Sequence, residues 1–157
     1  MTTYWPKWKD AIQAELASLE KRKNFGPIIR TPEGIKPMGY KWFFIRKRNE
    51  KGEVMRYKAR LVAQGFSQRP GIDYMGTYSP VVDAITFRYL INLAVHEKHE
   101  MCLMDIVTAY LYGSLDHNIF MKILEAFKVS EAYKDSRETC SIKLQKSLYG
   151  LKQSGRM

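Results

Sequence analysis

One carboxylate, Asp105, closes the apolar run Leu103-Met104 and stands five residues before the aromatic ring of Tyr110. An ionised carboxylate is costly to bury unless it is paired or binds a cation. We therefore interpret Asp105 as a candidate ligand for a divalent metal beside a nucleotide phosphate. A lone aspartate at the end of a strand is more often a helix cap or a salt-bridge partner, so this stretch alone leaves both alternatives open.

Further carboxylates would be needed to build a two-metal centre, in which several of them surround cations about 3.5 to 4 Å apart. None of the other aspartates forms an Asp-Asp pair on an expected strand. Four of them fall in expected turns or loops: Asp73, Asp83, Asp116 and Asp135. By spacing alone, the metal interpretation of Asp105 therefore has no second ligand.

A β-hairpin is predicted by two β-prone runs, residues 40–48 and 54–63, around the turn at residues 49–52. Alternation with a period of two divides the second run into two faces. The apolar face comprises Met55, Tyr57, Ala59 and Leu61, and the cationic face comprises Arg56, Lys58 and Arg60. The first run ends in three more cations, Arg46, Lys47 and Arg48.

The cations make this hairpin a candidate phosphate-binding flap. A guanidinium group can contact two phosphate oxygens at once, and an ammonium group supplies a point charge. An ordinary solvated hairpin face is the alternative, and the charge pattern does not decide between the two.

The remaining elements are predicted from periodicity and turn residues. An amphipathic helix is expected over residues 6–23, and a second helix after an N-cap at Asp83, ending near residue 97. A short buried strand is expected over residues 100–106, with further strands at residues 119–121 and 141–144. This order predicts a single α+β domain over residues 1–157, with antiparallel strands and packing helices.

The composition favours a polyanionic partner. The 157 residues carry a net charge of +10. Nucleic acid is the first candidate partner and an anionic membrane the second, while a soluble basic protein without such a partner is the plain alternative.

The two cysteines, Cys102 and Cys140, lie far apart without a CxxC motif. We expect both to be reduced, buried thiols with no disulfide partner. No apolar run approaches the roughly 18 residues of a membrane span, and the N-terminus lacks the apolar core of a signal peptide. These features predict a protein of the cytoplasm or nucleus that is neither secreted nor inserted in a membrane.

Several blocks in combination are more specific than any one of them. They are Arg56–Phe66 (RYKARLVAQGF), Gly71–Tyr74 (GIDY), Tyr78–Val82 (YSPVV), Met104–Gly113 (MDIVTAYLYG) and Lys146–Gln153 (KSLYGLKQ). In this order and spacing they resemble the copia-type retrotransposon reverse transcriptase over almost the whole chain. The spacing of Trp8, Ala11, Glu15 and Leu19 also fits the opening helix of that family.

The resemblance implies the fingers and part of the palm of a right-hand polymerase. Asp105 matches the first metal-binding aspartate of the family, which binds magnesium, and Tyr110 matches the aromatic residue that excludes a ribose 2′-hydroxyl. A plain core tyrosine is the alternative for Tyr110. The implied nucleotide contacts are Lys47, Lys58, Arg60, Tyr110, Gly150 and Gln153. The implied nucleic-acid contacts are Arg46, Arg48, Arg56 and Lys152, and the partners would be an RNA or DNA template-primer and deoxynucleoside triphosphates.

Two departures from the family pattern qualify this expectation. The Tyr- or Phe-Val-Asp-Asp strand that carries the other metal-binding aspartates is absent, and Lys122–Phe127 replaces a Gln-Pro-x-Gly-Phe run. We therefore expect an N-terminal fragment, incomplete at its C-terminus, with negligible polymerase activity on its own. The alternatives are a non-catalytic basic nucleic-acid-binding remnant, or a decayed gene product with an unpaired sheet edge and exposed apolar surface.

Overall fold

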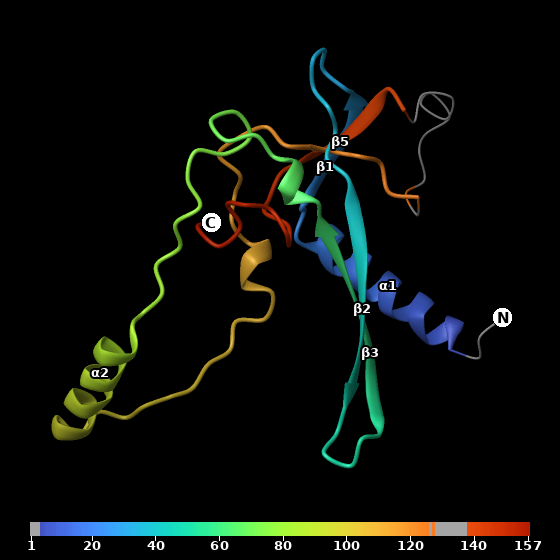
Figure 1. The fold of residues 1–157 in the computed structure, drawn as a ribbon. Helices are drawn as coiled ribbons and strands as arrows, with labels where there is room; N and C mark the ends of the chain where they lie inside the picture. The colour runs from blue at the N-terminus through green and yellow to red at the C-terminus, as the bar shows by residue number, and fades with distance from the viewer. Residues whose placement is uncertain (1–3, 126, 128–137) are drawn as a thin grey trace.

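The computed structural model describes residues 4–125, 127 and 138–157, and its elements are arranged as in Figure 1. They are α1 (Trp5–Lys21), β1 (Phe25–Arg30), β2 (Tyr40–Arg48), β3 (Val54–Ala63), α2 (Ala84–His96), β4 (Phe120–Met121) and β5 (Cys140–Leu144). Two short 3-10 turns lie at Gly65–Ser67 and Ala109–Leu111. The strands form two antiparallel sheets, β1-β5-β4 and β2-β3, so the predicted α+β class is confirmed.

Helix α1 lies against the hairpin formed by β2 and β3 (Figure 1). It begins with Pro6 in its first turn, where the missing N–H costs no helical hydrogen bond, and it ends two residues before the predicted end. The Trp8 ring packs edge-on against Phe44 and Tyr57, with ring centroids 5.1 and 4.7 Å away. Leu19 is fully buried at the other end of the helix. The predicted apolar face of this helix is therefore confirmed.

The predicted hairpin is also confirmed. Tyr40 pairs with Ala63 at its base, and Lys47 pairs with Arg56 near its tip. The turn contains Gly52 at a φ of +80°, a conformation that glycine adopts at little cost. Three apolar side chains of β3 are buried, Ala59, Leu61 and Ala63, whereas Met55 near the tip is exposed.

Strand β1 was not predicted, because the sequence analysis treated Gly26-Pro27 as the punctuation that ends α1. Pro27 is tolerated because β1 lies at the edge of the three-stranded sheet, where no further strand requires its N–H. The register against β5 shifts between Phe25 and Ile28, which accommodates the Gly-Pro pair as an irregularity.

The core lies between the three-stranded sheet, α1 and the base of the hairpin. Its fully buried large apolar side chains are Leu19, Leu61, Leu111, Met121, Leu124, Ile142, Leu144 and Leu148. Asn24 is buried among them, and its Nδ2 donates to the carbonyl oxygens of Leu111 and Ser147 at 3.0 and 2.7 Å. One side chain thus joins two segments that are far apart in the sequence.

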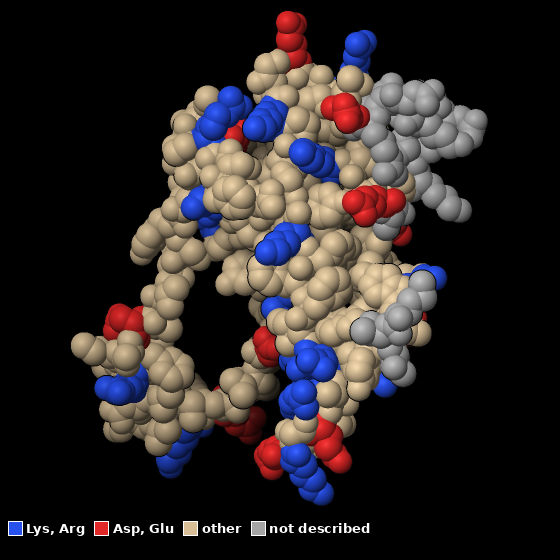
Figure 2. Space-filling view, turned by 45° about the vertical axis from the view of Figure 1, so that its right-hand side comes forward, with Lys and Arg blue, Asp and Glu red and all other residues tan. Residues whose placement is uncertain are grey.

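Helix α2 confirms the predicted start, since Asp83 Oδ1 accepts hydrogen bonds from the backbone N–H groups of Ile85 and Thr86. The helix nevertheless stands apart from the sheets on extended segments (Figures 1 and 2). None of its residues is buried, and Phe87 and Leu90 are about half exposed. The sequence correctly indicated an amphipathic helix, but in this structure its apolar side covers no core.

The buried strand predicted over residues 100–106 is wrong. These residues form no strand, and Leu103 and Met104 are 100% and 82% exposed. An apolar run becomes a strand only when a neighbouring strand pairs with it. This segment leads from α2 back toward the sheets, and no described strand pairs with it. The prediction of two buried thiols is half right, because Cys140 is buried but Cys102 is exposed, and both are free.

Within the described residues, no helix is long and apolar enough to cross a lipid bilayer.

Candidate anion-binding site beside the hairpin

The outer edge of β3 is closed by two hydrogen bonds from different parts of the chain. The backbone N–H of Leu61 donates to Glu15 Oε1 of α1 at 3.3 Å. The N–H of Ala63 donates to the carbonyl oxygen of Tyr149 at 2.7 Å. Because unpaired edge groups would otherwise need water or another strand, these bonds hold α1 and the segment around Tyr149 against the hairpin.

A pocket of about 210 Å³ lies between these elements. Cations from two parts of the chain line it: Arg22 from the C-terminal end of α1, and Arg56 and Lys58 from β3. Glu15 is the one acidic residue among the lining residues. Val107 and Thr108 complete the wall, so the chain immediately after Asp105 reaches the pocket although Asp105 itself does not line it.

The charges around this pocket are unbalanced. Burial lowers the pKa of Lys58, and the neighbouring cations Arg60, Lys47 and Arg56 lower it further, against the opposite effect of Glu15. An anion that entered the pocket would relieve this repulsion.

The pKa of the Glu15 carboxyl is shifted in the opposite direction, upward. Burial raises its pKa, while the hydrogen bond from Leu61 and the charges of Lys58, Arg60 and Arg22 act against that rise. The pocket therefore combines a desolvated acid with an excess of positive charge.

The Tyr149 ring connects Arg60 and Tyr110 to this pocket. The Arg60 guanidinium lies 5.6 Å from the ring centroid of Tyr149, and its Nε is buried without a hydrogen-bond partner. The Tyr110 ring lies edge-on to Tyr149 at 6.4 Å and is 52% exposed. Tyr110 is therefore a partly exposed ring beside the site rather than a core tyrosine.

The residues after Tyr149 have structural contacts. Gly150 has a φ of +88°, and a Cβ atom there would overlap Ala63 O and Val62 Cγ1. Gln153 is fully buried, with its Oε1 accepting from Gln68 Nε2 at 3.0 Å and its Nε2 donating to Asp73 O at 3.2 Å. Both ends of the Gln153 amide are thus occupied within the protein.

The other predicted site residues lie outside the pocket. Asp105 and Lys152 are exposed, and so are the three cations at the end of β2: Arg46, Lys47 and Arg48. Figure 2 shows Lys and Arg side chains spread over the face in view, including the hairpin, with acidic side chains among them. No group of three or more His, Cys, Asp or Glu side chains that could hold a metal is found in the residues described.

The model of one protein family, reverse transcriptase (RNA-dependent DNA polymerase), matches residues 23–157. The chain belongs to the reverse transcriptase family. The match includes the hairpin and the segment around Tyr149, and hence most of the pocket. Reverse transcriptases generally use a divalent metal, a nucleic-acid template-primer and nucleotide substrates.

Among the curated relatives of this reverse transcriptase chain are transposon Pol polyproteins of the copia type. The Pol polyprotein from transposon TNT 1-94 of Nicotiana tabacum is 38% identical over 146 residues, which are 93% of this chain and 10% of the relative. The Pol polyprotein from transposon RE1 of Arabidopsis thaliana is 33% identical over 150 residues, 96% of this chain and 10% of the relative.

A more distant similarity extends to yeast. The transposon Ty1-BL Gag-Pol polyprotein of Saccharomyces cerevisiae is 31% identical over 99 residues, which are 63% of this chain and 5% of the relative. The chain thus spans about a tenth of the length of the plant relatives that it matches. No solved structure matches it significantly.

The lining residues that were not singled out as site residues from the sequence include Glu15, Arg22 and Tyr149. Glu15 carried a usable signal, because it stands three residues after Ile12 and four before Leu19, on the apolar side of a predicted amphipathic helix. A carboxylate at such a position needs a partner, and the backbone of β3 supplies it. Tyr149 lies within the block Lys146–Gln153, but nothing in that block indicated that its ring faces the pocket. Arg22 carried no local signal, since its role depends on the tertiary fold.

Proposed function

We propose that this chain supplies the fingers and part of the palm of an RNA-directed DNA polymerase domain of the copia type. We further propose that the pocket between α1, β3 and the segment around Tyr149, here called the hairpin pocket, receives the phosphates of an incoming deoxynucleoside triphosphate. The observation that carries the proposal is the convergence of Arg22, Arg56 and Lys58 around one buried acid. The segment that follows Asp105 lines the same pocket.

The side chains of the pocket have distinct roles in this proposal. Lys58 and Arg56 contact the phosphate oxygens, Lys58 as a point charge and Arg56 through its guanidinium fork. Arg60 lies against the Tyr149 ring and would add positive potential to the pocket. Tyr110, partly exposed beside Tyr149, offers a ring that would lie against the sugar and exclude a 2′-hydroxyl by shape.

The remaining predicted contacts are assigned by their positions. Arg46, Lys47 and Arg48 are exposed on β2, and Lys152 is exposed in the segment after Tyr149, so these cations are available to the phosphates of a template-primer. Gly150 permits close backbone packing on Ala63. Gln153 would act indirectly, by holding its segment against Gln68 and Asp73, because both ends of its side-chain amide are already hydrogen-bonded to those residues.

The metal of the proposed reaction is magnesium, with Asp105 as one ligand. The described residues do not complete such a site, because Asp105 is exposed and no group of three possible ligand side chains is found among them. A magnesium centre typically draws on more than one carboxylate or phosphate ligand. We therefore assign no catalytic step to this arrangement and expect negligible primer extension by the chain alone.

The second candidate function is non-catalytic binding of nucleic acid, favoured by the net charge of +10. Its affinity should fall steeply with salt but show no dependence on a triphosphate. In either case the partner is a nucleic acid, so we place the protein in the cytoplasm or nucleus.

Equilibrium binding of deoxythymidine triphosphate to the purified chain tests the proposal. We expect Lys58→Gln to weaken binding about tenfold or more, because a charge-assisted contact is worth roughly 1.5–3 kcal/mol. The control is Lys51→Gln, which removes the same charge from the exposed hairpin turn. Equal binding by the two variants would reject the pocket, and binding of template-primer unaffected by triphosphate would favour the second function.

A further inference from the structure

Asn24 joins the end of α1 to the two segments that carry the Tyr110 and Tyr149 rings. Its side chain is fully buried, and its Nδ2 donates to the carbonyl oxygens of Leu111 and Ser147 at 3.0 and 2.7 Å. These acceptors lie 87 and 123 residues further along the chain. Leu111 directly follows Tyr110, and Ser147 stands two residues before Tyr149. One amide group therefore holds the backbone next to each of the two rings.

The backbone of Asn24 has a separate role at the end of α1. Lys23 adopts a left-handed φ of 57°, and the N–H of Asn24 donates to the carbonyl oxygen of Leu19 at 3.1 Å. A left-handed residue commonly ends a helix in this way and satisfies its last carbonyl groups. The Asn24 carbonyl oxygen accepts from the N–H of Gln145 at 2.9 Å. Any residue except proline could form these backbone bonds, so the end of the helix does not explain the buried amide side chain.

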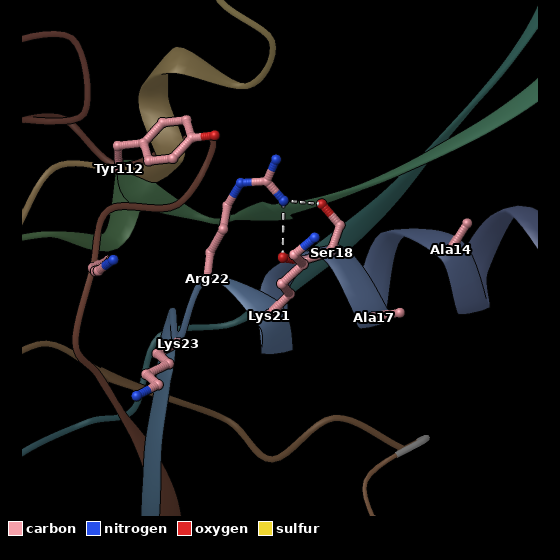
Figure 3. Close-up of a pocket in the computed structure, with 8 residues that line it drawn as sticks. Ala14, Ala17, Ser18, Lys21, Arg22, Lys23 and Tyr112 are labelled. Atoms are coloured by element: carbon pink, nitrogen blue, oxygen red, sulfur yellow. Dashed lines mark hydrogen bonds between the residues drawn. The ribbon is translucent and has the colours of Figure 1, made fainter.

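The end of α1 makes a second contact with the segment after Tyr110. Arg22 Nη1 donates to the carbonyl oxygen of Ser18 at 2.9 Å and to the Ser18 hydroxyl, as the dashed lines in Figure 3 show. The Arg22 guanidinium reaches toward the Tyr112 ring, whose centroid lies 5.3 Å from it. The turn that carries Tyr110 is thus followed by a ring that contacts α1 and by a carbonyl oxygen that is bonded to Asn24.

The segment that carries Tyr149 is attached on two sides. The N–H of Ser147 donates to the carbonyl oxygen of Gly113 at 2.8 Å, which joins this segment directly to the one after Tyr110. The carbonyl oxygen of Tyr149 accepts from the N–H of Ala63 on β3 at 2.7 Å. Because these bonds do not involve Asn24, loss of its amide should loosen the two ring-bearing segments rather than separate them.

The amide of Asn24 is a costly way to fill space. A buried polar group lowers stability unless its hydrogen bonds compensate for lost hydration. Asn24 Oδ1 is buried without a hydrogen-bond partner, so only the Nδ2 side of the amide is compensated. The function of the side chain is therefore to be sought in the two carbonyl oxygens to which it donates.

We propose that Asn24 is the positioning residue that fixes the Tyr110 ring against the Tyr149 ring. The two ring centroids lie 6.4 Å apart, with an interplanar angle of 66°. The consequence for the substrate rests on the proposed function, in which Tyr110 excludes a 2′-hydroxyl by shape. A ring that Asn24 holds in place rejects a ribonucleotide more strongly than a loosely held ring, because steric exclusion requires a side chain that does not move aside.

The first test measures the nuclear Overhauser effect between the ring protons of Tyr110 and Tyr149 in the purified chain without a ligand. The effect should be clear in the wild type and weak or absent in Asn24→Ala. Met121→Ala is the matched control, because Met121 is fully buried on β4 and its truncation destabilises the core without removing a hydrogen bond to either ring segment. Equal losses in the two variants would reduce the role of Asn24 to general stability and overturn the proposal.

A second variant separates the lost hydrogen bonds from the cavity that alanine leaves. Asn24→Asp keeps the size of the side chain but replaces the donating amide by a carboxylate, and it should show the same loss of ring contact. Circular dichroism and the unfolding midpoint show whether each variant is folded, and added sucrose favours the folded state. A ring contact that persists in a folded variant of either kind would overturn the positioning role.

The second test compares the binding of deoxyuridine triphosphate and uridine triphosphate, which differ only in the 2′-hydroxyl. The preference of the wild type for the deoxy form should fall about twofold or more in Asn24→Ala and should remain in Met121→Ala. An unchanged preference in an Asn24→Ala protein that has lost the ring contact would overturn the link to the sugar. If the wild type binds neither nucleotide, the proposed function fails, whereas the ring contact still decides the role of Asn24.

Discussion

The carboxylate of Glu15 on α1 accepts a hydrogen bond from the backbone N–H of Leu61 on β3, at 3.3 Å, and both residues are buried. This contact attaches the first helix to the free edge of the hairpin and places an acid beside Arg22 and Lys58. Glu15 thus satisfies one N–H of the strand edge and offsets part of the positive charge of the candidate site.

Replacing Glu15 by Gln should change how stability depends on pH. The pKa of Glu15 is raised in the folded state by burial, so the unfolded chain releases this proton at lower pH than the folded chain. The stability that this carboxyl contributes is full below its unfolded-state pKa and falls as the pH rises through its folded-state pKa. Glutamine keeps an acceptor for the Leu61 N–H without a titratable group.

The measurement is urea unfolding of both proteins between about pH 4 and pH 7, on either side of the ordinary carboxyl range. The Gln variant should gain stability relative to the wild type as the pH rises. A difference that is constant with pH, or one that moves in favour of the wild type, would contradict the burial of this carboxyl. Comparison of the two proteins cancels the opposite pH dependence of Asp116, whose pKa is lowered by its hydrogen bond with His117.

Gly150→Ala should be strongly destabilising. The φ of Gly150 is +88°, and the added Cβ would overlap the backbone oxygen of Ala63. Gly34→Ala is the matched control, because Gly34 has a φ of +74° and an added Cβ there would meet nothing within 4 Å. The control should cost about 1 kcal/mol from its left-handed conformation alone, and Gly150→Ala clearly more. Equal losses in thermal unfolding would show that the approach of Gly150 to β3 is not as close as described.

Asn24→Ala should destabilise the fold by about 2–4 kcal/mol, because it leaves two buried carbonyl oxygens, Leu111 O and Ser147 O, without their donor. Asn24→Asp should cost at least as much, since an ionised carboxylate would face those same oxygens. Denaturant unfolding provides the measurement. An Asp variant as stable as the wild type would place the Asn24 side chain elsewhere.

Helix α2 allows a direct comparison of buried and exposed leucines. Leu90→Ala should change the free energy of unfolding by no more than about 0.5 kcal/mol, because Leu90 is half exposed on a helix with no buried residue. Leu111→Ala, at a fully buried position, should cost about 2–5 kcal/mol. If the two variants lose similar stability, α2 packs against the core in solution.

Elements specified by neighbouring residues were predictable from the sequence. The period of α1, the turn and alternation of the hairpin, and the cap at Asp83 are all local patterns, and the structure contains each of them. Elements that depend on distant partners were not predictable in the same way. Strand β1 forms because β5 pairs with it. Residues 100–106 are exposed and form no strand, because no described strand pairs with them.

The same distinction applies to the candidate site. Lys58 and Arg56 were identified from their alternation on a strand, and Tyr110 from a sequence block. Glu15 was missed as a site residue because a carboxylate on a helix is usually solvated. That Lys58 and Glu15 share one pocket follows only from the packing of α1 on β3.

The most direct test of the central claim is the pKa of Lys58, measured by NMR with and without deoxythymidine triphosphate. Burial and the surrounding cations hold this pKa below its ordinary value, and a bound triphosphate would add negative charge beside it. We predict a clear rise in the pKa of Lys58 on saturation with the triphosphate. An unchanged Lys58 pKa at saturating triphosphate would contradict the assignment of this pocket.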